Sequence, residues 1–158
     1  MALYWMPSRF DPPVIPAQLS PITFDFGSAA ALIDQFKPDT AYVVVGGNYT
    51  DDTNRAPGDL KVSWKWNTSM RFGESEAFRR EYNQVLSQVN FYMKQHETRY
   101  GYVCSDTEFV KRLDGNGRLA IATPIPWTSG GVGQPSVLLA LWYLGVLVAE
   151  DNNWALAV

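Results

Sequence analysis

Residues 75–98 contain neither glycine nor proline, and their apolar side chains recur at helical spacing. Side chains three and four positions apart share one face of an α-helix, and serine is a favoured residue immediately before a helix. The pattern predicts a long amphipathic helix capped by Ser75, which needs a sheet or another helix to cover its apolar stripe. That stripe is formed by Phe78, Tyr82, Val85, Leu86, Val89, Tyr92 and Met93.

Two strands are predicted before this helix. Residues 40–45 are rich in β-branched and aromatic side chains and lie between Pro38 and a glycine pair, which is typical of a strand. From Asp59 to Trp66 polar and apolar residues alternate, which places Trp64 and Trp66 on one face, packed against a helix, and Asp59 and Lys61 on the other. Residues 28–36 favour a short helix, and residues 48–58 a polar loop.

After the long helix, residues 100–113 and 119–124 are predicted to form two strands joined by a turn at residues 114–117. Residues 129–133 form a glycine-rich connection. Residues 137–149 are almost entirely apolar but fall short of the roughly 20 residues of a membrane-spanning helix, so we expect a buried core helix and no membrane. The order of elements predicts an α/β fold, with a central mixed β-sheet flanked by α-helices.

The domain organisation follows from length and proline content. A chain of 158 residues suits one core, so residues 26–158 are expected to form a single domain. Residues 1–25 hold five prolines and several aromatic residues, which predicts an extended arm. This arm is a candidate contact between two copies in a homo-oligomer. No secretory signal pattern is present at the N-terminus, so the expected location is intracellular, in the nucleus or cytoplasm.

Composition excludes some chemistries. One cysteine and one histidine can build neither a disulfide framework nor a Cys/His zinc site, so a metal would need oxygen ligands. The net charge of −3 argues mildly against nonspecific binding of nucleic acid, which depends on neutralising phosphates.

Asp39, Asp59 and Lys61 form the candidate site. If the two predicted strands form a hairpin, Asp39 lies opposite residues 61–64, which brings both carboxylates to one place. Carboxylates hold Mg²⁺, and the metal stabilises charge on a phosphate and lowers the pKa of a bound water. A lysine can orient that water and neutralise charge on phosphorus. These residue types therefore suit phosphodiester hydrolysis.

The same residues resemble a known family. Pro38-Asp39, followed twenty residues later by Asp59-Leu60-Lys61, is similar to the signature of the PD-(D/E)XK nuclease superfamily, whose fold is restriction-endonuclease-like. Gln88 and Tyr92 on the following helix resemble the Gln-x-x-x-Tyr motif of its RecB-like branch. Residues 99–103, 124–127 and 138–144 resemble uncharacterised fungal proteins assigned to this superfamily.

The resemblance implies a nuclease that cuts DNA rather than RNA with Mg²⁺ or Mn²⁺. Asp39 and Asp59 would be the metal ligands, Lys61 would position the water, and Gln88 and Tyr92 would support the site. A further acid, which the family often takes from the preceding helix, has no clear equivalent, and Asp34 is the nearest candidate. The alternative is a catalytically inactive nuclease-fold domain that serves as a binding or assembly module.

For several of these residues the sequence is equally consistent with a purely structural role. Asp39 suits a turn that leads into a strand, and Asp59 with Lys61 suits an exposed ion pair of small energy. Tyr92 suits core packing. His96 near a helix C-terminus suits interaction with the helix dipole. The basic side chains that could contact phosphate or simply face solvent are Lys65, Arg71, Arg79 and Arg80.

Overall fold

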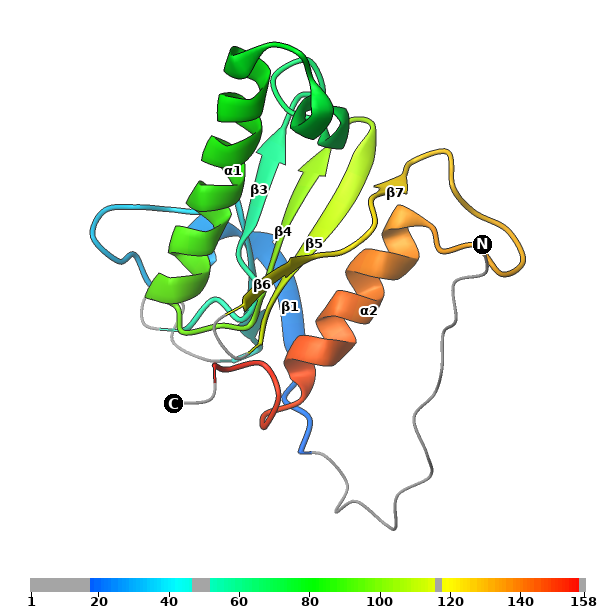
Figure 1. Ribbon diagram of the computed structural model, residues 1–158. Coiled ribbons are helices and arrows are strands. Elements are labelled where there is room, and N and C mark those ends of the chain that lie inside the picture. Colours follow the sequence, from blue (N-terminus) through cyan, green and yellow to red (C-terminus); the bar gives the residue numbers. More distant parts are fainter. Residues whose placement is uncertain (1–17, 47–51, 116–117, 157–158) are drawn as a thin grey trace.

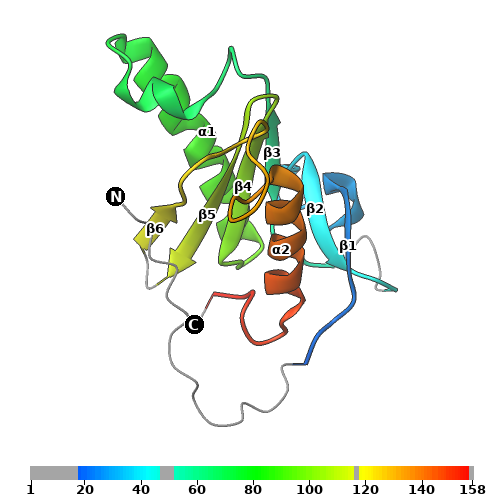
Figure 2. The ribbon, with the colours of Figure 1, turned by 90° about the vertical axis from the view of Figure 1, so that its right-hand side faces the viewer.

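A mixed β-sheet between two helices forms the fold. The computed structural model describes residues 18–46, 52–115 and 118–156, with side chains for all of these except residues 111–119. Helix α1 (Glu76–Gln95) covers one face of the sheet, and helix α2 (Val137–Ala149) covers the other (Figure 1). Figure 2 looks onto α2 with the sheet behind it. The α/β class and the mixed sheet flanked by helices are as predicted.

The sheet follows the order β1-β2-β3-β4-β5-β6, and β7 pairs with β5. Among these strands only β3 and β4 pair in parallel, and the other pairs are antiparallel. Parallel neighbours need a long connection, and here α1 supplies it. The strands are β1 (Ile22–Phe26), β2 (Thr40–Val44), β3 (Gly58–Lys61), β4 (Tyr100–Ser105), β5 (Glu108–Gly115), β6 (Arg118–Ile121) and β7 (Ile125–Pro126).

Alternation along the strands divides most of the core into two halves, beside a small third cluster of Ala30, Ala41 and Val43. The half under α1 contains Trp66, Met70, Tyr82, Val85, Leu86, Val89, Met93, Val103 and Val110. The half under α2 contains Tyr42, Ala56, Tyr100, Tyr102, Phe109, Val137, Leu144 and Val148. Neighbouring residues of β4, Tyr102 and Val103, therefore point to opposite faces, as the pleat of a strand requires.

Helix α1 begins where its sequence pattern predicts but ends at Gln95, three residues before the predicted end, and Glu97 has a left-handed φ of 51°. Ser75 is its N-cap, and the Ser75 hydroxyl accepts a hydrogen bond from the Ala77 N–H. Every predicted stripe residue is buried except Phe78, which is 51% exposed.

The helix predicted over residues 28–36 does not form. A single 3₁₀ turn, η1 (Gly27–Ala29), takes its place. Asp34 and Gln35 have φ angles of 52° and 63°, in the left-handed region, where an α-helix of L-residues cannot continue. The Phe36 N–H instead donates to the Ile33 carbonyl, which closes a turn before Pro38.

The prediction of a single strand over residues 100–113 is wrong, because these residues lie in two strands, β4 and β5. Ser105 causes the reversal, because its hydroxyl oxygen accepts hydrogen bonds from the Thr107 and Glu108 N–H groups at 3.2 and 3.1 Å. Such a side-chain contact competes with a continuous strand. The predicted turn at residues 114–117 connects β5 to β6, although residues 116–117 lie outside the described part of the chain.

The alternating segment that begins at Asp59 forms a shorter strand than predicted. Strand β3 ends at Lys61, and the N–H groups of Lys65 and Trp66 both donate to the Val62 carbonyl in a turn. This turn separates the two tryptophans: Trp66 is fully buried, whereas Trp64 is 73% exposed. The prediction of a shared packed face was therefore wrong for Trp64.

Helix α2 has the predicted bounds but not the predicted burial. Val137, Leu144 and Val148 are buried against the sheet. The rest of its surface is apolar and exposed, through Leu138, Leu139, Trp142, Tyr143 and Val146. The sheet covers only one side of a helix, and no second layer of the described residues covers the other. In the described part of the chain, no helix is long and apolar enough to cross a membrane.

The expected boundary between arm and domain, at residues 25 and 26, falls inside a strand. Residues 22–25 belong to β1, which pairs with β2 at the edge of the sheet. Gln18 and Ser20 make backbone hydrogen bonds to Asp151 and Ala149, just after α2. The remainder of the predicted arm, residues 1–17, lies outside the described residues, as does the contact between copies expected of it.

Candidate active site

The backbone brings Asp39 and Asp59 together. Asp39 lies directly before β2, and its N–H donates to the Gly58 carbonyl at 3.0 Å. Its carboxylate then accepts a hydrogen bond of 2.8 Å from the Leu60 N–H. The convergence was expected, but the register was not: Thr40 pairs with Gly58, so Asp39 lies beside residues 58–60 rather than opposite residues 61–64.

Asp59 and Lys61 share the face of the sheet that α1 covers. Asp59 pairs with Val103 of β4, and Val103 belongs to the core under α1. Leu60 projects to the other side and is 51% exposed. The alternation predicted for Asp59, Leu60 and Lys61 is therefore present, with the unexpected result that the charged face is the more buried one.

Asp59 is a buried carboxylate, only 2% exposed. Burial raises its pKa from the usual 3.8 to about 6, the Lys61 ammonium opposes that rise, and the Asp39 carboxylate adds to it. Lys61 Nζ lies 2.5 Å from Asp59 Oδ2, and the Lys61 side chain is 22% exposed. The interpretation of Asp59 and Lys61 as an exposed surface ion pair is therefore wrong.

Gly58 sits at the centre of a clamp that holds β2, β3 and β4 behind Asp59. The hydroxyls of Thr40 and Tyr102 are hydrogen-bonded at 2.5 Å in a buried position across Gly58. A Cβ at Gly58 would lie 2.2 Å from Tyr102 Cζ and 2.3 Å from Thr40 Oγ1. Sequence reasoning did not identify this clamp, and its only signals were the threonine after Asp39 and the glycine before Asp59.

Gly27 fixes the other side of Asp39. The Gly27 N–H donates to the Asp39 carbonyl at 3.0 Å, and a Cβ at Gly27 would lie 1.8 Å from the Pro38 carbonyl oxygen. Only glycine permits so close an approach of two backbones. The Pro38-Asp39 step is therefore held between η1 and β3.

Asn54 lies in the segment predicted to be a polar loop, yet it is fully buried. Its side chain accepts from the Tyr42 N–H at 3.1 Å and donates to the Thr40 carbonyl at 3.1 Å, so it bonds β2 in place of a neighbouring strand. The Asn54 N–H donates to His96 Nδ1 at 3.2 Å. Burial lowers the pKa of His96, so this histidine is a neutral acceptor and the interpretation as a cation on the helix dipole is wrong.

Gln88 and Tyr92 lie on the helix that covers the site. Gln88 Nε2 donates to the Tyr92 hydroxyl at 2.8 Å, and Tyr92 is 4% exposed. Helix α1 packs on β3 and β4. The hydrogen bond described for this pair joins the two residues to each other and not to Asp39, Asp59 or Lys61.

The donor set at the site suits a hard divalent cation. Two carboxylates against one ammonium leave an excess negative charge. Among the described residues, Asp59 Oδ2 has Lys61 as its ionic neighbour but receives no hydrogen bond of ordinary geometry, which leaves lone pairs for a cation. No group of three or more acidic, histidine or cysteine side chains gathers in the described residues, and Asp34 does not complete one. Mg²⁺ commonly uses one or two carboxylates together with waters and substrate phosphates, so two carboxylates are sufficient.

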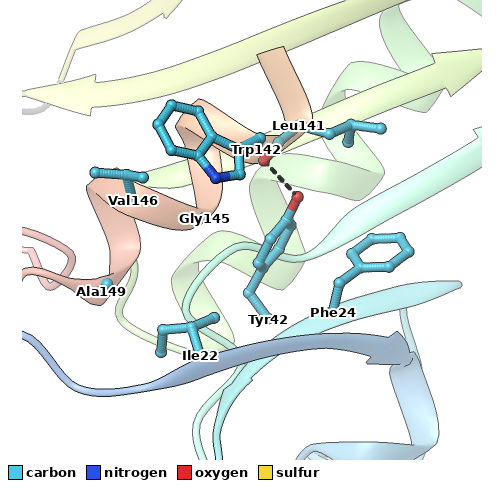
Figure 3. Close-up of a pocket in the computed structure, with 8 residues that line it drawn as sticks. All are labelled: Ile22, Phe24, Tyr42, Leu141, Trp142, Gly145, Val146 and Ala149. Atoms are coloured by element: carbon cyan, nitrogen blue, oxygen red, sulfur yellow. Dashed lines mark hydrogen bonds between the residues drawn. The ribbon is translucent and has the colours of Figure 1, made fainter. Parts of the chain in front are cut away.

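An apolar pocket of about 440 Å³ lies elsewhere, between β1, β2 and α2. Figure 3 shows Trp142 and Val146 of α2 on one side and Ile22 and Phe24 of β1 on the other, with the Tyr42 hydroxyl donating to the Leu141 carbonyl at 2.9 Å. Tyr42 points to the α2 face, so this pocket lies across the sheet from Asp59. The pocket and the carboxylates are separate features.

Comparison of the chain with protein-family models, curated proteins and solved structures finds no match. The resemblance to the PD-(D/E)XK superfamily therefore depends on the sequence motifs alone.

Proposed function

We propose that this protein is a metal-dependent nuclease that hydrolyses phosphodiester bonds of DNA, with a restriction-endonuclease-like core of the PD-(D/E)XK type. The observation that carries the proposal is the meeting of Asp39, Asp59 and Lys61 beside β3, where the Asp39 carboxylate bonds the Leu60 N–H and Lys61 contacts Asp59. These are the three residues of the motif, and they come from two separate segments of the chain.

Asp39 and Asp59 would hold Mg²⁺ or Mn²⁺. When bound, such a cation polarises the phosphodiester and lowers the pKa of a bound water. The residues of the chain have distinct roles: the Asp39 carboxylate is fixed by the Leu60 N–H, and Asp59 is fixed by burial. A carboxylate held in place before the ligand arrives needs little reorganisation on binding.

Lys61 would position the attacking water and neutralise charge that develops on the phosphate. Its side chain is partly exposed and extends from the same face of β3 as Asp59, so its ammonium can turn from Asp59 toward a substrate. Gln88 and Tyr92 would support the site from α1, with the Tyr92 hydroxyl oriented by the Gln88 amide.

The test is cleavage of labelled single- and double-stranded DNA by the purified full chain with Mg²⁺ or Mn²⁺. Asp59→Ala and Lys61→Ala should each lower the rate by roughly 100-fold or more, since each removes a group that acts at the reacting phosphate. Asp25→Ala and Lys94→Ala are matched controls on β1 and on α1, and they should leave the rate unchanged. Absence of metal-dependent cleavage, or equal rates for Asp59→Ala and the wild-type protein, would refute the proposal.

A second candidate function is a catalytically inactive nuclease-fold module that assembles with a second copy of this chain. The exposed apolar face of α2 favours it, because interfaces within homodimers are more apolar than other protein surfaces. Light scattering distinguishes the two functions: the assembly module predicts a dimer that Trp142→Ser and Val146→Ser together dissociate, and no metal binding. A monomer at all concentrations would refute it.

A further inference from the structure

Two aromatic side chains are exposed in the connection between β3 and α1. Trp64 is 73% exposed and Phe72 is 81% exposed. They are not needed to anchor the connection, because Trp66 does this: its ring stacks on Tyr82 at 5.8 Å and its Nε1 donates to the Tyr82 carbonyl at 3.3 Å. Phe26 and Trp142 are exposed to a similar degree, so exposure by itself does not distinguish these two rings.

A cation lies over each exposed ring. Lys65 Nζ is 5.0 Å from the centre of the Trp64 ring, and the Arg71 guanidinium carbon is 5.4 Å from the centre of the Phe72 ring. Residues 62–72 contain no aspartate or glutamate, although the whole chain has a net charge of −3. The connection therefore carries two cations and no acidic residue of its own, on a protein whose net charge is negative. We call Trp64, Lys65, Arg71 and Phe72 the stacking ledge.

Two carboxylates from the β4–β5 hairpin hold the backbone of the ledge in one shape. Asp106 accepts from the Ser63 N–H and hydroxyl, at 2.5 and 3.0 Å. Glu108 accepts from the Thr68 N–H and hydroxyl, at 2.5 and 2.8 Å. These acids lower the positive charge nearby, but their oxygens face the backbone of the connection. A surface ordered in advance loses less entropy when a ligand binds.

Trp64, at one end of the ledge, lies close to the candidate site. Trp64 follows Lys61 by three residues, which bounds their separation at about 11 Å of extended chain. The connection runs on the α1 side of the sheet, since Trp66 and Met70 belong to the core under α1, and Asp59 and Lys61 face the same side. At about 3.4 Å per stacked nucleotide, Trp64 is therefore at most about three nucleotides from Lys61.

We propose that the stacking ledge binds unpaired bases of the substrate on Trp64 and Phe72, so that the site acts on single-stranded DNA or on single-stranded ends of a duplex. Aromatic rings bind unpaired bases of any sequence by stacking, and neighbouring cations contact the backbone. In a continuous duplex the base faces are stacked on each other and are closed to these rings. The inference rests on the proposed nuclease function for its substrate, but binding itself needs no cleavage.

The experiment measures binding by fluorescence anisotropy in an Asp59→Asn background of the full chain, which separates binding from hydrolysis. The probe is a labelled single-stranded DNA of about 15 nucleotides, near the upper site size of single-strand binding folds, and the same sequence as a blunt duplex. Trp64→Ala and Phe72→Ala should each weaken single-strand binding by roughly 5- to 100-fold and leave duplex binding unchanged. Thermal unfolding checks that each variant folds.

Matched controls come from exposed aromatic residues outside the ledge. Trp142 on α2 is 65% exposed and Phe26 on β1 is 75% exposed, so Trp142→Ala and Phe26→Ala remove comparable rings. Both should bind the single strand like the parent. Lys65→Gln should lower the slope of log affinity against log salt by about one unit, as loss of one phosphate contact does.

The outcomes separate the two proposals. If the wild-type protein cleaves DNA but Trp64→Ala and Phe72→Ala bind the single strand normally, the proposed role of the stacking ledge is wrong and the proposed nuclease function is supported. If no cleavage occurs but these two variants alone lose single-strand binding, the proposed role of the stacking ledge is supported and the proposed nuclease function is wrong. Equal losses in the ledge variants and the controls, or no single-strand binding by the parent, would overturn the ledge.

Discussion

Replacing Asp59 by asparagine should stabilise the protein at neutral pH while it removes the proposed nuclease activity. The buried Asp59 carboxylate has a pKa raised from 3.8 to about 6, so the folded state disfavours its ionised form. The cost is absent below pH 3.8 and grows to its full value above about pH 6. A pKa shift of this size lowers the free energy of unfolding by about 3 kcal/mol at high pH, at about 1.4 kcal/mol per pH unit.

Asparagine keeps the shape of the side chain and removes its charge. We expect the variant to gain about 2–3 kcal/mol of stability at pH 7.5, a net value that already includes the loss of the Lys61 contact, and less than about 1 kcal/mol at pH 4. Lys61 is 22% exposed and can turn to solvent. Urea unfolding of both proteins at a series of pH values, with unchanged slopes, measures the difference directly.

Asp106→Asn is the matched control, because the Ser63 N–H and hydroxyl lower the pKa of Asp106. The ionised form of Asp106 stabilises the folded state at neutral pH, and this contribution is lost as the pH falls through the lowered pKa. Asp106→Asn should therefore lower the free energy of unfolding at pH 7.5, whereas Asp59→Asn should raise it. His96 also titrates, but it is present in every variant and cancels from the difference. A gain for Asp59→Asn that does not vary with pH, or a loss at pH 7.5, would refute the reasoning.

Three further predictions follow from the site. Metal-dependent cleavage should rise as the pH increases through about 6, because Asp59 must be ionised to bind a cation; a rate already maximal at pH 5 would contradict this. Mg²⁺ at ten times its dissociation constant should add about 1.4 kcal/mol of stability to the wild-type protein, measured by thermal unfolding, and none to Asp39→Asn. Gly58→Ala should cost about 2 kcal/mol or more, since its Cβ would overlap Tyr102 Cζ at 2.2 Å. Gly130→Ala, where a Cβ meets nothing nearer than 4.0 Å, should be neutral in the same assay.

The sequence by itself determined the elements whose signals are local. Helix α1 begins at its predicted cap and buries most of its predicted stripe, because capping and helical spacing act within a few residues. Helix α2 has the predicted bounds for the same reason, and β2 ends within one residue of its prediction. Strand alternation and resemblance also predicted that Asp39, Asp59 and Lys61 lie close together, and they do.

Only the tertiary structure decided how these elements are covered and joined. The apolar composition of α2 could not indicate that the sheet would bury one side and leave Trp142 exposed. Residues 54–58 look like a solvated loop, yet the Asn54 side chain replaces a strand beside β2, a contact between segments 12 and 14 residues apart. The exposure of Trp64 depends on the turn at Val62, which interrupts a regular alternation.

The candidate site, too, depends partly on the sequence and partly on the tertiary structure. Its residue types and their spacing are properties of the chain, whereas the burial that raises the pKa of Asp59 exists only after α1 closes over β3. The approach of Asp39 to the Leu60 N–H depends on contacts of Gly27 and Gly58 with segments distant in sequence, at Pro38 and Tyr102. Pairing across a sheet is a long-range property, because each strand can satisfy its backbone with many partners and only the packed core selects one register.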